Sequence, residues 1–189
     1  MREFFVEKIS NLKTVFGYDD TLSNKENISL LSKKLLIQKL TENGLSFDVH
    51  ISREEKGKPF FTHNPNIHFS ISNTTDYIAV IVSENRVGID IEHLRKYNET
   101  LVKRFFNPTE IEYLRGIKPS EQDKAFTQLW TIKESYVKKT GTGISGNFIQ
   151  NNLTPPVKSY TEELSYNTLS SHIHSFYLPT HQLFISIAE

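Results

Sequence analysis

A short segment in the middle of the chain alternates apolar and acidic residues, which restricts the conformation it can adopt. Branched apolar residues occupy positions 87, 89 and 91, whereas Gly88, Asp90 and Glu92 occupy the positions between and after them. Successive side chains of a β-strand point to opposite faces, so this pattern predicts a strand with one buried apolar face. We expect the opposite face to be solvated and to carry both acids, with Gly88 leaving room for a ligand.

A second segment, Trp130 to Lys138, is predicted to be part of a helix that begins near residue 120 and ends before Gly141 and Gly143. Glu134 precedes Lys138 by one helical turn, which is the spacing of an ordinary surface ion pair. The apolar positions of the helix, however, place Glu134 at the edge of its buried face. A carboxylate there is costly unless it is paired or binds a metal.

Together the two segments supply three carboxylates that could converge on a hard cation such as Mg²⁺, because such ions prefer oxygen ligands. A cation beside lysines is a site for phosphate. The combination therefore suggests an enzyme that acts on a diphosphate. A half-exposed strand with two solvated acids and a helix with a surface ion pair is the alternative.

The remaining pattern indicates an α+β fold. Strands are expected at 2–7, 67–72, 77–83 and 86–92, with a tight turn at Glu84-Asn85 joining the last two, and a closing hairpin at 172–178 and 182–188. Helices are expected from about 29 to 43, after a turn-like segment at 19–26, and from Asn107-Pro108, which has the residues of a helix start. Because a helix followed by strands occurs twice, we expect two similar small α+β halves, residues 1–88 and 89–189.

Composition excludes several classes of function. The chain has 22 basic and 22 acidic residues, and this balance argues against binding nucleic acid or an anionic membrane. It has no cysteine, a charged amino terminus unlike a signal peptide, and no apolar run of the roughly 20 residues that span a bilayer, so we expect a cytoplasmic protein. The histidines do not suggest a zinc site, and we expect His172 and His174 to face solvent.

Five short motifs occur in an order that resembles the 4′-phosphopantetheinyl transferases, and the surfactin-type single-chain subclass in particular. They are Gly57-Lys58-Pro59, Phe69-Ser70-Ile71-Ser72-Asn73, Gly88-Ile89-Asp90-Ile91-Glu92, Arg104-Phe105-Phe106, and Trp130 to Lys138 with Gly141-Thr142-Gly143. The resemblance covers about residues 56–145. It implies a pseudo-dimer of two α+β halves with a pseudo-twofold axis, a working monomer, and coenzyme A in the cleft between the halves.

The resemblance also implies the reaction. Phosphopantetheine would pass from coenzyme A to a serine of an apo acyl or peptidyl carrier protein, with Mg²⁺ or Mn²⁺, and adenosine 3′,5′-bisphosphate would be released. Asp90, Glu92 and Glu134 would hold the metal. Glu134 and Lys138 would be catalytic, as base for the carrier serine and as partner of the leaving phosphate. The coenzyme A contacts would be Lys58, Pro59, Ser72, Asn73, Lys133 and Lys138.

The sequence departs from the family pattern at two places. Asn73 stands where the family usually has histidine, and asparagine can donate a hydrogen bond but cannot carry charge. Ile28 falls near an expected arginine for the 3′-phosphate, for which Lys25, Lys33 or Lys34 could substitute. Three other functions remain open: a homologue that binds coenzyme A or carrier without transfer, a Mg²⁺-dependent nucleotide phosphohydrolase, and a structural interaction module.

Overall fold

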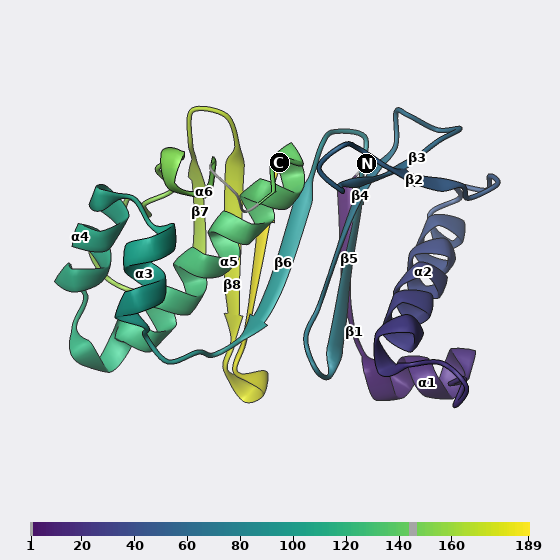
Figure 1. Cartoon of the computed structure of the whole chain (residues 1–189), viewed down its shortest axis with the longest axis horizontal. Coiled ribbons are helices and arrows are strands. Elements are labelled where there is room, and N and C mark those ends of the chain that lie inside the picture. The colour runs from purple at the N-terminus through teal and green to yellow at the C-terminus, as the bar shows by residue number, and fades with distance from the viewer. Residues whose placement is uncertain (1, 144–146) are drawn as a thin grey trace.

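The computed structural model describes residues 2–143 and 147–189 and is an α+β protein whose described strands all pair antiparallel (Figure 1). The first part of the chain forms β1 (Arg2–Lys8), α1 (Ile9–Phe16), α2 (Asn24–Glu42), β2 (Ile51–Arg53), β3 (Pro59–Phe61), β4 (His68–Asn73) and β5 (Tyr77–Ser83). The second part forms β6 (Gly88–His93), α3 (Glu99–Phe105), α4 (Pro108–Gly116), α5 (Gln122–Thr140), α6 (Asn147–Gln150), β7 (Glu163–Asn167), β8 (His172–Leu178) and β9 (Leu183–Ala188).

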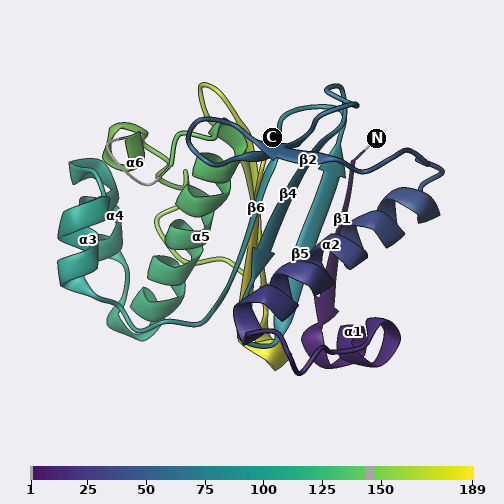
Figure 2. The ribbon, with the colours of Figure 1, turned by 45° about the vertical axis from the view of Figure 1, so that its right-hand side comes forward.

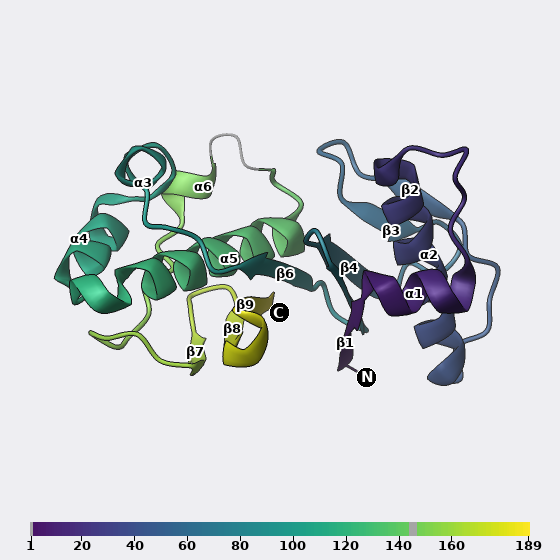
Figure 3. The ribbon, with the colours of Figure 1, turned by 90° about the horizontal axis from the view of Figure 1, so that it is seen from below.

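Each part of the chain has its own main sheet. The first sheet has the strand order β1-β5-β4, and the second has the order β6-β9-β8-β7, while β2 and β3 form a separate pair. Helix α2 lies over the first sheet and α5 over the second, as the view from below in Figure 3 shows. The chain changes sheets between Ser83 and Gly88, near the boundary predicted between residues 88 and 89. That the halves are related by a pseudo-twofold axis stays a prediction.

Local signals explain where the predicted elements begin and end, and where the predictions were wrong. Helix α2 begins at Asn24 rather than near Ser29, because Ser23 and Glu26 form a capping box in which each side chain accepts the other's backbone N–H. The predicted turn-like segment at 19–26 thus includes a helix start. The sequence analysis did not predict α1 or β7, whereas the closing hairpin is confirmed as β8 and β9.

Strands β5 and β6 do not form the pair that a tight turn at Glu84-Asn85 suggested, since they belong to different sheets. Strand β6 instead lies beside β4, as Figure 2 shows, and serine side chains join the two. The Ser70 hydroxyl accepts the backbone N–H of Ile89 at 3.1 Å, and the Ser72 hydroxyl accepts that of Ile91 at 3.2 Å. The two backbone N–H groups of β6 that face β4 thus have hydrogen-bond partners, although the two strands form no backbone hydrogen bonds of a shared sheet.

Among the described residues, three clusters of buried apolar side chains hold the fold together. One packs α1 and α2 on the first sheet, and one packs α3, α4 and α5 on the second. The third lies between the two sheets and consists of Tyr77, Ala79, Ile81, Val87, Ile89, Ile91, Leu183, Ile185 and Ile187. The predicted apolar face of β6 is therefore buried against the first sheet, and β5 is buried on both faces.

The other face of β6 is not solvated as predicted, because helix α5 covers it. A Cβ atom on Gly88 would lie 1.9 Å from the carbonyl oxygen of Ser135 and 2.4 Å from the backbone nitrogen of Lys139. The missing side chain of Gly88 thus makes room for the backbone of α5 and not for a ligand, which corrects the earlier expectation.

We predict that Gly88→Ala strongly destabilises the protein, by about 3 kcal/mol or more, because the added methyl group forces α5 away from β6. Urea unfolding monitored by circular dichroism measures the loss. Gly116→Ala, in α4, is the matched control, since a Cβ there meets no atom within 4 Å. Equal midpoints for the two variants would contradict this account of the contact.

Candidate active site

Two adjoining cavities lie where the parts of the chain meet. The larger has a volume of about 1180 Å³ and is lined by the start of α2, the β2–β3 loop, the end of β4 and the C-terminal end of α5. The smaller, of about 320 Å³, is lined by β4, β6 and α5. Both linings include Ile71, Asn73, Glu92 and Lys138, so the two cavities form one continuous site.

The three predicted acids line the smaller cavity together. Asp90 and Glu92 come from the face of β6 that α5 covers, and Glu134 comes from α5 itself. Among residues 2–143 and 147–189, the one group of three metal-binding side chains with ligand atoms all within 4.8 Å lies elsewhere. The ligand atoms of the three carboxylates are therefore not all within 4.8 Å of one another, although the three side chains share the cavity.

Asp90 is buried, and one of its carboxylate oxygens accepts two hydrogen bonds. Its Oδ1 accepts hydrogen bonds from the Lys138 ammonium at 2.7 Å and from the Ser72 hydroxyl at 2.8 Å. Lys138 thus pairs with Asp90 across the helix–strand contact, and not with Glu134 one turn before it, as the simplest interpretation of its spacing suggested. Ser72, predicted as a phosphate contact, lines the cavity but also joins β4 to β6.

Arg95 is a cavity residue whose place in the site the sequence analysis missed. Its guanidinium lies 5.3 Å from the centre of the Trp130 ring and donates a hydrogen bond to Glu92 at 3.4 Å. The only sequence signal is that Arg95 follows Glu92 by three residues, just beyond the end of β6.

The lining of the smaller cavity includes three acids but two cations, and the pKa values of two of the acids are raised. Burial, together with the charges of Asp90 and Glu92, raises the pKa of Glu134 to about 7, although Lys138 and Arg95 oppose the shift. Burial likewise raises the pKa of Glu92, with Asp90 adding to the shift and Arg95 opposing it. In this cavity the carboxylates repel one another, and their burial disfavours the charged form. A bound cation would reduce both effects, so the cavity is suited to bind one.

The predicted coenzyme A contacts differ in where they lie. Lys58 and Pro59 line the larger cavity, but the buried Lys58 ammonium donates to the carbonyl oxygens of Val87 and Lys138. Burial lowers the pKa of Lys58 to about 8, and nearby Arg86 adds to the effect. Lys58 therefore connects the start of β6 to the end of α5. Asn73 is exposed at the rim of both cavities.

Two of the three candidate lysines for a 3′-phosphate line the larger cavity. Lys25 and Lys33 do so from α2, beside Ile28. Lys34 instead donates to the carbonyl oxygen of Phe16 at 2.9 Å and is not part of the lining. The end of β2 adds Arg53 and the β2–β3 loop adds Lys56, so the wall of the larger cavity is rich in cations, as a site for a polyphosphate requires.

Lys133 does not lie in either cavity, which corrects its assignment as a coenzyme A contact. Its ammonium is 1% exposed and lies 2.7 Å and 2.9 Å from the two carboxylate oxygens of Glu110 in α4. Glu110 also accepts the backbone N–H groups of Asn107 and Leu153. Lys133 lies about 100° around α5 from Glu134, so it points into the core of the second part.

A family model described as the 4′-phosphopantetheinyl transferase superfamily matches residues 86–188. The chain belongs to this superfamily. The matched range contains Asp90, Glu92, Glu134 and Lys138, and it begins after Lys58, Ser72 and Asn73. The metal-site candidates thus lie inside the family match, whereas most of the candidate coenzyme A contacts lie outside it.

Several relatives are similar over half of the chain or slightly more. A 4′-phosphopantetheinyl transferase of Bacillus subtilis is 39% identical over 102 residues, which cover 54% of this chain and 44% of the relative. The 4′-phosphopantetheinyl transferase gsp of Aneurinibacillus migulanus is 36% identical over 115 residues, covering 61% and 47%. The 4′-phosphopantetheinyl transferase Sfp of Bacillus subtilis (strain 168) is 36% identical over 98 residues, covering 52% and 44%. The chain thus spans about half the length of the relatives it matches.

We predict that Lys133→Met destabilises the protein by about 3–5 kcal/mol, because the buried Glu110 carboxylate loses its cation. Urea unfolding measures this loss. The control is Lys103→Met on α3, whose ion pair with Glu99 is exposed and so contributes little to stability. Under conditions where Lys133→Met is folded, its coenzyme A affinity should match that of the unmodified chain. Unchanged stability with lost affinity would restore Lys133 to the binding site.

The raised pKa of Glu134 predicts a pH-dependent stability when divalent cations are removed with a chelator. The folded carboxyl holds its proton more tightly than the unfolded one, whose ordinary value is 4.5. The resulting stabilisation is present below that value and is lost as the pH rises through about 7. The unfolding free energy relative to Glu134→Gln should therefore be larger at about pH 5 than at about pH 8. Glu163→Gln on exposed β7 should show no such change, and a pH-independent difference would disprove the shift.

Proposed function

We propose that the chain transfers 4′-phosphopantetheine from coenzyme A to a serine of an apo acyl or peptidyl carrier protein and releases adenosine 3′,5′-bisphosphate. One observation carries the proposal: a cavity lined by three acids and Lys138 opens into a larger cavity with cationic walls. The larger cavity supports binding of the nucleotide and its phosphates, and the smaller supports the reaction at the diphosphate. Membership of the superfamily supports the same reaction.

The substrate would bind with its charged end against the cationic wall. Lys25, Lys33, Arg53 and Lys56 are the cavity residues that could pair with the phosphates of coenzyme A. Lys58 and Pro59 would shape the wall beside them, and Asn73 could donate a hydrogen bond at the junction of the two cavities. This arrangement would place the diphosphate next to Lys138.

The residues of the smaller cavity fit Mg²⁺, or Mn²⁺ in its place, because they offer carboxylate oxygens whose mutual repulsion a cation would relieve. We propose Asp90, Glu92 and Glu134 as its ligands. When bound, the ion would neutralise charge on the diphosphate and on the departing bisphosphate.

The chain's own groups would move the proton and stabilise the leaving group. The carrier serine oxygen would form a bond to the phosphorus next to the pantetheine, and the bond from that phosphorus to the adenosine-side phosphate oxygen would break. Glu134, which lies in the cavity beside Lys138, would take the serine proton directly or through water. The Lys138 ammonium would donate a hydrogen bond to the oxygen that departs, so that the negative charge developing there is stabilised.

The structure also bears on partners and location. Within the residues that it describes, no helix combines the length and the apolar character needed to cross a bilayer. A cytoplasmic location, a working monomer and the absence of nucleic-acid partners stay predictions from the sequence.

We predict that Glu134→Gln lowers the transfer rate at least about a hundredfold, because the amide neither accepts the serine proton nor binds the cation well. The measurement is intact-protein mass spectrometry of an apo acyl carrier protein incubated with the chain, coenzyme A and Mg²⁺. A gain of one phosphopantetheine that EDTA abolishes is the expected result. Glu163→Gln, which changes an exposed acid on β7, is the matched control and should retain the full rate.

Other outcomes of the same experiment separate the alternative functions. Folded protein that binds coenzyme A but modifies neither acyl nor peptidyl carriers would indicate a homologue without transferase activity. Release of adenosine bisphosphate without any gain in carrier mass would indicate a phosphohydrolase. An absence of metal-dependent coenzyme A binding would indicate a structural module.

A further inference from the structure

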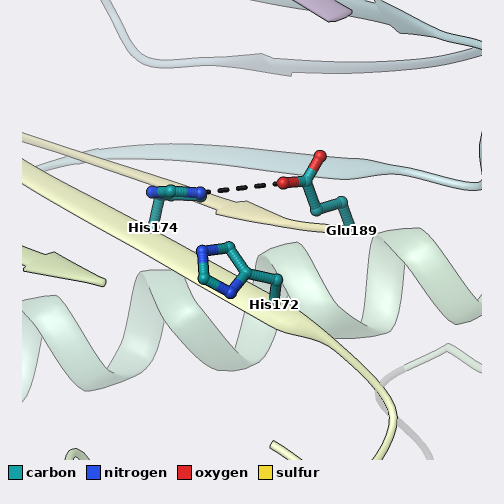
Figure 4. Close-up of side chains that lie close together, drawn as sticks. All are labelled: His172, His174 and Glu189. Carbon is teal, nitrogen blue, oxygen red and sulfur yellow. Dashed lines mark ion pairs between the residues drawn. The ribbon is translucent and has the colours of Figure 1, made fainter. Parts of the chain in front are cut away.

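A second group of potential metal ligands lies outside both cavities. His172 and His174 are two residues apart on β8 and share one face of the sheet. Glu189 follows β9 and lies directly opposite His172, with which it exchanges two backbone hydrogen bonds of 2.7 Å and 3.0 Å. One ligand atom from each of the three side chains lies within 4.8 Å of the others (Figure 4).

The hydrogen bonds of His172 leave the lone pair of its Nε2 atom directed at a possible metal ligand position. Its Nδ1 lies 2.5 Å from the amide oxygen of Asn167, which can only accept, so Nδ1 carries the proton. The Nε2 atom therefore has a lone pair, and Figure 4 shows the ring turned toward His174 and Glu189. The Ser165 hydroxyl, 3.1 Å away, donates to Nε2 when no metal is bound. An imidazole fixed through its second nitrogen is the usual arrangement of a metal-binding histidine.

The other two ligands are held in place and partly shielded from water. The His174 ring is parallel to that of Phe176, with centres 6.4 Å apart, and its Nε2 lies 3.6 Å from a carboxylate oxygen of Glu189. The side chains of His174 and Glu189 are 21% and 23% exposed, so both are largely shielded from solvent. This corrects the expectation for His174. The rings of His172 and His174 lie 4.3 Å apart.

Lys139, whose ammonium interacts electrostatically with Glu189, is hydrogen-bonded to other groups. Burial lowers the pKa of Lys139, and the charge of Glu189 opposes this shift. The Lys139 ammonium donates hydrogen bonds to the Ser170 carbonyl at 2.7 Å and to the Ser171 hydroxyl at 2.8 Å.

We propose that His172, His174 and Glu189 bind a divalent transition-metal ion such as Zn²⁺, independently of the site for coenzyme A. Two imidazoles and one carboxylate favour Zn²⁺, Co²⁺ or Ni²⁺ over Mg²⁺, which prefers oxygen ligands. Three protein ligands leave a fourth position for water. The ion would link β8 to the segment after β9, and β9 contributes Leu183, Ile185 and Ile187 to the core between the sheets. The role implied is stabilisation of the last strand.

The test is calorimetric titration of the metal-free chain with Zn²⁺, together with visible absorption after addition of Co²⁺. To remove binding at the other acids, the measurements use the double variant Asp90→Asn with Glu134→Gln. We expect one equivalent of Zn²⁺ to bind, Co²⁺ to give absorption bands that Zn²⁺ displaces, and Mg²⁺ to have no effect. Adding His174→Gln or Glu189→Gln to this background should weaken Zn²⁺ binding at least tenfold with the circular dichroism spectrum unchanged.

The chain offers a matched control in a second pair of histidines. The rings of His50 and His63 lie 5.0 Å apart next to Asp48, outside the proposed site. His63→Gln in the same background should leave the affinity for Zn²⁺ unchanged. Loss of binding in His63→Gln but not in His174→Gln would overturn the proposal, as would the absence of any Zn²⁺ binding in the double variant.

Discussion

The approach of helix α5 to strand β6 at Gly88 determines where the functional groups lie. Without a side chain at position 88, the backbone of α5 rests on the strand, and the residues that follow on the same face, Asp90 and Glu92, come next to the helix. The opposite face of β6 packs against the first sheet, and its edge is held to β4 by serine hydroxyls. Strand β6 is thus fixed on three sides, so its acids have little freedom to move.

Successive side chains of helix α5 are rotated by about 100° around its axis, so neighbouring residues can lie in the cavity and in the core. Glu134 and Lys138 are four residues apart, so they face the same side and line the smaller cavity. Lys133, one residue before Glu134, points instead toward α4 and pairs with Glu110. A motif in which two basic residues flank an acid therefore contains one residue that stabilises the core and two that line the site.

The parts of this arrangement that follow local periodicity could be predicted from the sequence. The alternation at 87–92 predicted β6 and put Asp90 and Glu92 on one face, and the helical spacing put Glu134 beside Lys138. What could not be predicted depends on contacts between distant segments.

Three errors illustrate this limit. Nothing local indicates that α5 covers the acidic face of β6, or that α4 supplies a buried partner for Lys133. The turn residues at 84–85 suggested a hairpin, but which sheet a strand joins is decided by the packing of whole faces.

Two lysines of α5, Lys133 and Lys138, each pair with an acid, and the two pairs differ in a way that separates structure from function. The opposite charges of Lys133 and Glu110 balance. Backbone N–H groups donate further hydrogen bonds to the carboxylate, so that pair is complete without a ligand. Around Lys138 the charges do not balance, since three acids face two cations and two of the acids have raised pKa values. A folded chain retains such an imbalance at a cost in stability, and buried groups with perturbed pKa values are concentrated at functional sites. The incompleteness of the Asp90 cluster, more than its acidity, is what points to a bound cation and a phosphate substrate.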